Sequence, residues 1–195
     1  MSVLFHGSFG LYRDRLAKIL KAGLNGPSLN DKQLAEPLGY GAPFAAKYRS
    51  WLHKTGLTNQ KLPLQLTEMG RVVFEQDPEL SHETSILFLH HELTQTNRAF
   101  AWHFFTIEFL PQQDSFSRED LITALSSTIE ARSLGSGKPD KMAGIIARKL
   151  LECYTEDYSL GSLRILQKDG SRFRTGELPI SGPWASTSEL KAAYN

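Results

Sequence analysis

The chain has 195 residues and a formal net charge of +1, with 41% hydrophobic and 22% charged residues, which excludes wholesale disorder. One cysteine excludes an internal disulfide and a cysteine-built zinc finger. No run approaches the roughly 20 apolar residues that a membrane span needs, and the first ten residues show no secretory signal pattern. We therefore expect a soluble cytoplasmic protein that makes no membrane contact.

The small net charge conceals an asymmetry along the chain. Residues 1–76 carry ten Lys and Arg against five Asp and Glu, residues 77–138 carry four against nine, and residues 139–195 carry eight against seven. A basic N-terminal part can present one face to a polyanion. Ordinary scatter of charge between segments remains the alternative on charge alone.

The first 76 residues have the order of elements of a winged helix-turn-helix: helix, helix, turn, helix, small hairpin, helix. Hydrophobic spacing predicts helices at 12–24, at 32–38 and from Pro43 to about Thr55, two brief strands at 57–66, and a helix after Thr67. Asn30 or Asp31 is placed to cap the second helix, Gly56 stands at the C′ position of the third, and Thr67 is a plausible N-cap.

The remainder of the chain is predicted to be mostly helical. We expect helices at 81–94, at 98–110, after a cap at Ser117, and at 140–155, then a strand pair that turns at Lys168-Asp169-Gly170. The predicted fold is mainly α, with a winged helix-turn-helix domain at 1–76, a helical domain at 77–160, and a short C-terminal β-hairpin and tail at 161–195.

The third helix carries the functional prediction. At 100° per residue, its apolar side chains fall on one face and its polar and basic side chains fall on the other, and no acidic residue occurs between Ala42 and Glu68. A helix that enters a DNA groove needs small residues, cations for phosphates and donors for base edges. The predicted DNA-binding residues are Lys32, Gln33, Lys47, Arg49, Ser50, His53, Lys54, Asn59, Gln60 and Lys61. A solvated helix face in a domain that binds proteins is the alternative.

Catalytic motifs fail at their defining positions. Pro139 stands where a phosphate loop at 135–139 requires Ser or Thr, and Gln95 stands where a zinc motif that begins at His91 requires a second histidine. Four histidines, at positions 82, 90, 91 and 103, could assemble a metal site, but partly buried histidines bonded to neighbours are the commoner outcome. Cys153 is interpreted as a core residue. We predict no enzymatic activity, no catalytic residue, no metal and no cofactor.

Several stretches resemble a bacterial family, domain of unknown function 4007, over roughly the first 155 residues. The resemblance rests on the order and spacing of the following segments: His6-x-Ser8-Phe9-x-Leu11-x-Arg13, Leu38-Gly39-Tyr40-Gly41, Tyr48-Arg49-Ser50-Trp51-Leu52-x-x-Thr55-Gly56-Leu57, Leu66-Thr67-Glu68-Met69-Gly70, Trp102-x-Phe104-Phe105 and Phe116-Ser117-Arg118-Glu119. Genes of that family commonly lie beside those for DNA phosphorothioation and phage defence. The resemblance therefore implies an accessory protein of a DNA-modification or restriction cassette.

The leading hypothesis is a non-enzymatic protein of a bacterial DNA-modification or phage-defence system that binds duplex DNA through the winged helix. Its helical second half would dimerise or bind other proteins of the same gene cluster. An alternative is a protein-interaction adaptor that never contacts DNA and exposes an apolar patch on the aromatic segment 98–110. A metal-dependent enzyme built on the histidines is a third possibility.

Overall fold

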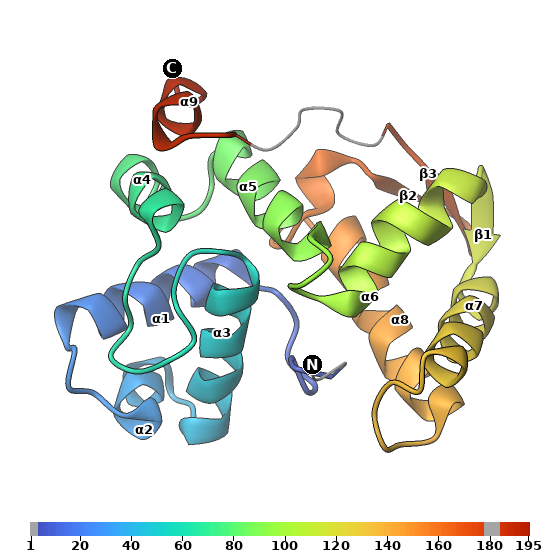
Figure 1. Ribbon diagram of the computed structural model, residues 1–195, viewed down its shortest axis with the longest axis horizontal. Helices are drawn as coiled ribbons and strands as arrows, with labels where there is room; N and C mark the ends of the chain where they lie inside the picture. The colour runs from blue at the N-terminus through green and yellow to red at the C-terminus, as the bar shows by residue number, and fades with distance from the viewer. Residues whose placement is uncertain (1–3, 178–183) are drawn as a thin grey trace. The chain divides into compact units, whose positions relative to one another are not determined.

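The computed structural model describes residues 4–177 and 184–195 and is mainly helical, with one small antiparallel sheet (Figure 1). The chain forms two compact units, each built from segments that are distant in sequence. The α1–α5 unit contains residues 11–93 and the described C-terminal residues 184–195; the sheet unit contains the described residues 4–10 and 94–177. The predicted boundaries at 76/77 and 160/161 fall inside these units.

The α1–α5 unit begins with the predicted series of helices. Its elements are α1 (Arg13–Asn25), α2 (Asp31–Ala35), the 3-10 turn η1 (Glu36–Leu38), α3 (Ala42–Lys54), α4 (Glu68–Gln76), α5 (Glu83–Thr94) and α9 (Thr187–Ala192). The predicted end of α3 is confirmed, since Gly56 has a φ of +71°, a conformation that side chains other than glycine rarely adopt. The predicted cap of α4 is also confirmed, because Thr67 Oγ1 accepts a hydrogen bond from the Gly70 amide at 2.8 Å.

The segment between α3 and α4 differs from the prediction. It is a loop closed by a single antiparallel bridge between Thr58 and Leu66, in place of two brief strands. Pro63 has no amide hydrogen to donate to a ladder. Leu64 is buried and packs against Gly23 of α1, where a Cβ would lie 2.3 Å from Leu64 Cδ1. The inward turn at Leu64 therefore ends the pairing, and residues 58–66 are called the 58–66 loop below.

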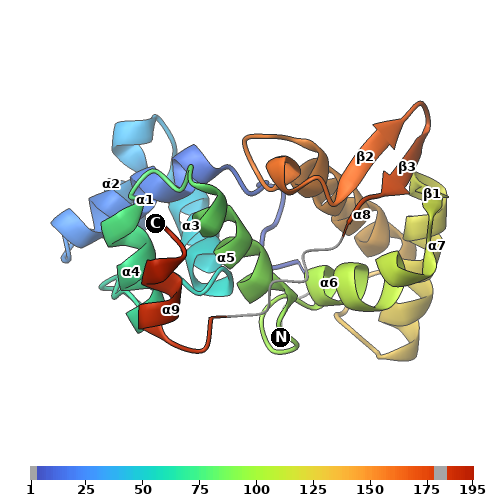
Figure 2. The same ribbon diagram turned by 90° about the horizontal axis from the view of Figure 1, so that it is seen from above.

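A C-terminal helix that the sequence analysis did not predict completes the α1–α5 unit. Helix α9 packs against α4, and the two helices lie side by side in both views (Figures 1 and 2). Thr84 Oγ1 donates a hydrogen bond to the Ala193 carbonyl at 2.8 Å, and the Ser85 and Tyr194 hydroxyls are 2.8 Å apart. The chain's last residues are thus tied to the first turn of α5.

The sheet unit combines helices with a three-stranded sheet. Its elements are α6 (Phe100–His103), the π-helical segment η2 (Phe104–Phe109), the 3-10 turn η3 (Leu110–Gln112), β1 (Ser115–Ser117), α7 (Arg118–Ala131), α8 (Pro139–Thr155), the 3-10 turn η4 (Gly161–Leu163), β2 (Leu166–Asp169) and β3 (Arg172–Thr175). Helices α7 and α8 pack against each other, and the single predicted helix at 98–110 is a succession of α, π and 3-10 turns.

The predicted C-terminal hairpin is confirmed as β2 and β3, with Gly170 in the turn at a φ of +60°. A third strand, β1, pairs with the other side of β3 and was not predicted, because three residues are too short for a periodic pattern. The predicted cap at Ser117 is confirmed: its Oγ accepts from the Asp120 amide at 3.1 Å, and the Asp120 carboxylate accepts from the Ser117 amide at 2.7 Å.

Candidate nucleic-acid interface

Helix α3 has the two faces that its sequence predicts. The buried face consists of Phe44, Tyr48, Trp51, Leu52 and Thr55, each at most 2% exposed. The opposite face carries Lys47, Arg49, Ser50, His53 and Lys54, all of which are half-buried. Burial of large apolar side chains stabilises the unit and fixes the orientation of the helix. The polar face is therefore presented by a rigid element.

Arg49 connects three segments of this face. Its Nε and Nη2 donate to the two carboxylate oxygens of Asp31 at 2.6 and 2.8 Å, and its Nη1 donates to the Gln60 carbonyl at 3.2 Å. The hydrogen bond to Asp31 raises the pKa of Arg49 above its usual value. A bidentate guanidinium–carboxylate pair fixes geometry as well as charge. Arg49 thus holds the start of α2 and the 58–66 loop against α3.

The start of α2 is closed by a reciprocal cap. Asn30 Oδ1 accepts from the amides of Lys32 and Gln33 at 3.0 and 3.1 Å, and Gln33 Oε1 accepts from the Asn30 amide at 3.0 Å. The amide oxygen of Gln33 therefore belongs to the capping box, whereas the Lys32 side chain is exposed. Sequence analysis proposed both Asn30 and Asp31 as caps; Asn30 caps the helix and Asp31 binds Arg49.

Two further polar side chains of α3 bond within the domain. Ser50 Oγ donates to the Ala46 carbonyl at 3.1 Å, one turn back along the helix. His53 Nδ1 lies 3.4 Å from the Thr58 carbonyl, so this nitrogen carries the proton where the contact is a hydrogen bond. Both contacts restrict what these side chains can offer to a ligand.

The 58–66 loop is braced by one residue pair. Asn59 donates its backbone amide to the Gln65 carbonyl and its side-chain amide to Gln65 Oε1, both at 2.9 Å. Gln60, Lys61 and Leu62 at the tip are exposed. Hydrogen bonds thus order the base of the loop. Its tip exposes the cation Lys61 and the side-chain amide of Gln60.

Of the predicted residues, Gln60 contacts Arg49 through its backbone carbonyl. Among the described residues, Lys32, Lys47 and Lys61 form no ion pair, and Asp31 is the acid that α2 contributes beside Arg49. Sequence analysis missed Asp31 as a partner, since its position at a helix start indicated only a cap. It also missed Gln65 as the partner of Asn59. The two residues are six positions apart, a spacing that neither a helix nor a strand pattern marks as a contact.

An aromatic stack adjoins the start of α3 and was not predicted as part of the site. The rings of Tyr40 and Phe44 stack in parallel with centroids 4.0 Å apart, and Tyr40 remains 42% exposed. The Arg15 guanidinium lies 4.2 Å from the Tyr12 ring centroid and 5.5 Å from that of Tyr40. Tyr40 therefore contacts both Phe44 and Arg15 while part of its ring remains exposed.

The histidines do not converge. No group of three or more His, Cys, Asp or Glu side chains in residues 4–177 and 184–195 is arranged to hold a metal ion. His82 Nδ1 accepts from the Thr84 amide at 3.2 Å, and His103 Nδ1 donates to the Thr94 carbonyl at 2.7 Å. Burial lowers the pKa of His90 to about 4, so this side chain is neutral at physiological pH.

Two other predictions concern buried side chains. Cys153 is in the core, as expected, and burial raises the pKa of its thiol to about 11, which leaves little thiolate at neutral pH. Trp102, Phe105 and Phe109 are all buried within the sheet unit. Their burial counts against the adaptor hypothesis in the form that requires an exposed patch on segment 98–110.

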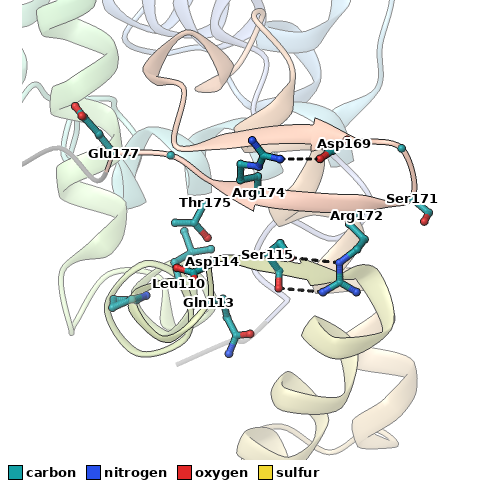
Figure 3. A pocket seen from close by; sticks show the side chains of 13 residues that line it. Leu110, Gln113, Asp114, Ser115, Asp169, Ser171, Arg172, Arg174, Thr175 and Glu177 are labelled. Carbon is teal, nitrogen blue, oxygen red and sulfur yellow. Dashed lines mark hydrogen bonds and ion pairs between the residues drawn. The ribbon is translucent and has the colours of Figure 1, made fainter.

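A hollow of about 1220 Å³ lies over the sheet, and both of its arginines make polar contacts within the protein (Figure 3). Arg174 Nη2 lies 3.1 Å from the Asp169 carboxylate, and Arg172 Nη2 donates to the Ser115 carbonyl at 3.0 Å. Asp114 and Glu177 also line the hollow. Its three carboxylates thus outnumber its two guanidinium groups, and we assign it no ligand.

Comparison with known proteins places the chain in a family. The model of the family described as protein of unknown function (DUF4007) matches residues 5–158. The chain belongs to this family. The match confirms the resemblance found in the sequence and covers α1–α8. No curated protein matches the chain. In addition, no helix among the described residues is long and apolar enough to cross a membrane.

The fold is similar to that of a solved protein. A crystal structure of magnesium ion-bound SspB superposes with a TM-score of 0.71 at 16% sequence identity and covers 93% of this chain. The alignment covers 62% of the SspB chain, so the present chain spans less than two thirds of that protein. At this identity the similarity establishes the shared fold alone.

Proposed function

We propose that this protein is a non-enzymatic DNA-binding accessory or regulatory protein of a bacterial DNA-modification or phage-defence system. In this proposal α1–α4 and the 58–66 loop act as a winged helix-turn-helix, with α3 in the major groove of duplex DNA and the loop as the wing. The similarity to SspB supports the fold on which the proposal rests. Membership of the DUF4007 family, whose genes commonly lie beside those for DNA phosphorothioation, supports the cellular context.

The observation that carries the proposal is the charge of the α3 face. Lys32, Lys47 and Lys61 lie on α2, on α3 and on the 58–66 loop, the three segments that Arg49 joins, and the Asp31 carboxylate is paired with Arg49. A surface of cations with few anions favours a polyanion, because each phosphate contact releases condensed counterions. Helix α3 is long enough to enter a groove and is fixed by its buried aromatic face.

Lysine substitution tests the interface. We expect the triple variant K32A/K47A/K61A to lose at least tenfold in affinity for a fluorescently labelled 20-base-pair duplex of mixed sequence, measured by anisotropy at low salt. The reason is that three phosphate contacts disappear, whereas among the described residues these three lysine side chains make no hydrogen bond within the fold. The single variant K141A is the control, because Lys141 is an exposed lysine on α8 in the sheet unit.

Equal affinity of the triple variant and the control would contradict the proposed interface. Absence of binding by the wild-type protein at low salt would instead favour the adaptor hypothesis. In that case a search for protein partners of the same face would follow. Thermal unfolding of each variant shows whether the loss of binding reflects loss of folding.

A further inference from the structure

Arg15 of α1 is a cation that aromatic side chains surround in place of a carboxylate. Its guanidinium lies 4.2 Å from the Tyr12 ring centroid and 5.5 Å from that of Tyr40, and it donates a hydrogen bond to the Tyr48 side chain. The neighbouring acid, Asp14, lies 3.4 Å from the ammonium group of Lys18. Within residues 4–177 and 184–195, no carboxylate forms an ion pair with Arg15.

The charge of Arg15 is therefore not cancelled by the fold. Tyr48 is fully buried, Arg15 is half-buried and Tyr40 is 42% exposed, so the guanidinium lies at the edge of the core and part of it reaches solvent. Aromatic rings attract a cation through their quadrupole, but they are neutral and leave its charge in place. A half-buried guanidinium of this kind retains its attraction for an anion from outside the fold.

The cluster also has hydrogen-bond donors to offer. A guanidinium carries five N–H donors in a planar fork, more than its bond to Tyr48 uses. In the part of the chain that the structure describes, the Tyr40 hydroxyl makes no hydrogen bond. A planar fork of N–H groups matches the oxygens of a phosphate, and tyrosine hydroxyls donate to the same oxygens. The donor set is therefore suited to a phosphate group.

This cluster lies at the N-terminal end of α3. Tyr40 stands two residues before Ala42, the first residue of α3, and stacks on Phe44 in the first turn. Helix α1, which carries Arg15, packs against α3. In a helix-turn-helix the N-terminal residues of the recognition helix meet the bases of the major groove, so groups beside that end come close to the phosphates that border the groove.

We propose that Arg15, assisted by the Tyr40 hydroxyl, is a further DNA-contacting residue and binds a backbone phosphodiester beside the groove that α3 enters. This inference rests on the proposed function and adds a fourth phosphate contact to those of Lys32, Lys47 and Lys61. It also gives the aromatic rings a part in binding. They hold the guanidinium in place before DNA arrives, so less side-chain freedom is lost on contact.

Salt titrations of substituted proteins test the contact on the labelled mixed-sequence duplex. We expect R15Q to bind about tenfold more weakly than the wild type at low salt, with a slope of log K against log salt that is shallower by about 0.9. Y40F should bind about threefold more weakly with an unchanged slope, because it removes a neutral donor. The matched control is R148Q, since Arg148 is an exposed arginine of α8 in the sheet unit, and it should bind as the wild type does.

The slope separates a phosphate contact from a structural role. If Arg15 only braced α1 against α3, R15Q would lose affinity without any change of slope, because no phosphate would be released. An R15Q slope equal to that of the wild type would therefore overturn this inference and leave DNA binding intact. Absence of binding by the wild-type protein would overturn the proposed function with it.

A measurement on the wild-type protein applies if thermal melting shows that R15Q is unfolded. The side-chain Nε–Hε signal of Arg15, assigned by its absence from the nitrogen–proton spectrum of R15K, should shift when unlabelled duplex is added. An unshifted signal in the presence of bound duplex would overturn the inference. Inorganic phosphate, compared with chloride at equal ionic strength, tests the other source of the same chemical group. A shift with inorganic phosphate and none with duplex would assign the site to free phosphate and contradict a backbone contact.

Discussion

At the scale of single residues, the type of a side chain was predictable but its partner was not. The sequence placed Arg49 on the polar face of α3, and the structure confirms that position. Its carboxylate partner lies 18 residues away, at the start of a different helix. The helical spacing of i and i+4 predicts neighbours within one helix, whereas Arg49 and Asp31 meet only through tertiary packing. Arg49, which is predicted to bind DNA, therefore also bridges segments within the domain.

Residue-level electrostatics give a prediction for stability. The pKa of His90 is lowered to about 4 by burial, against an ordinary value of 6.5. Between these values the unfolded chain binds a proton that the folded chain does not. Stability contributed by neutral His90 is therefore fully present above about pH 6.5 and is lost as pH falls toward 4.

We expect the H90Q variant to lose less stability than the wild type between pH 6.5 and 4.5, by about 2 kcal/mol at most. Urea unfolding monitored by circular dichroism at the two pH values measures the difference. Carboxylates contribute to both proteins alike, so the comparison isolates the histidine. Identical pH dependence of the two proteins would show that His90 is not held neutral.

At the scale of elements, prediction succeeded where hydrophobic periodicity is long and where a cap has a local signature. The bounds of α1, α3 and α8 agree with the sequence to within about two residues. The caps at Thr67 and Ser117 and the hairpin turn at Gly170 were also read correctly. Prediction failed for short elements. Strand β1, which has three residues, was not predicted, and the 58–66 loop has one bridge where two strands were expected.

The start of helix α9 has a capping pattern from which the helix could have been predicted. Ser186 Oγ accepts from the Glu189 amide at 3.2 Å, and Glu189 reaches back to the Ala185 amide at 2.9 Å. The spacing of Ser186 and Glu189 is that of a capping box. It was overlooked because the helix that follows has only six residues and a weak apolar pattern.

The close approach of α4 to the end of α3 gives a second stability prediction. A Cβ at Gly70 would lie 2.1 Å from the Leu57 carbonyl oxygen, and backbone cannot move aside as a side chain can. We expect G70A to destabilise the protein by more than about 2 kcal/mol, measured by chemical denaturation. The control is G144A in α8, where a Cβ meets nothing within 4 Å. That change should be neutral or stabilising by up to about 1 kcal/mol. Equal effects would refute the close approach.

At the scale of the whole molecule, the chain organisation was not predictable. The α1–α5 unit continues past residue 76 through α5 and takes up the C-terminal residues 184–195. Boundaries drawn between successive stretches of sequence cannot describe units that each join segments distant in the chain. Contacts such as that between Thr84 and Ala193 link residues 109 positions apart. A fragment cut at residue 76 would lack α5 and α9, so functional measurements should use the full chain.

The salt dependence of DNA binding by the wild-type protein tests the central claim most directly. Anisotropy titrations of one labelled mixed-sequence duplex at several salt concentrations give the slope of log K against log salt. With Lys32, Lys47 and Lys61 on phosphates, the account predicts binding at low salt and a slope of about −3. No binding at low salt, or a slope near zero, would contradict it.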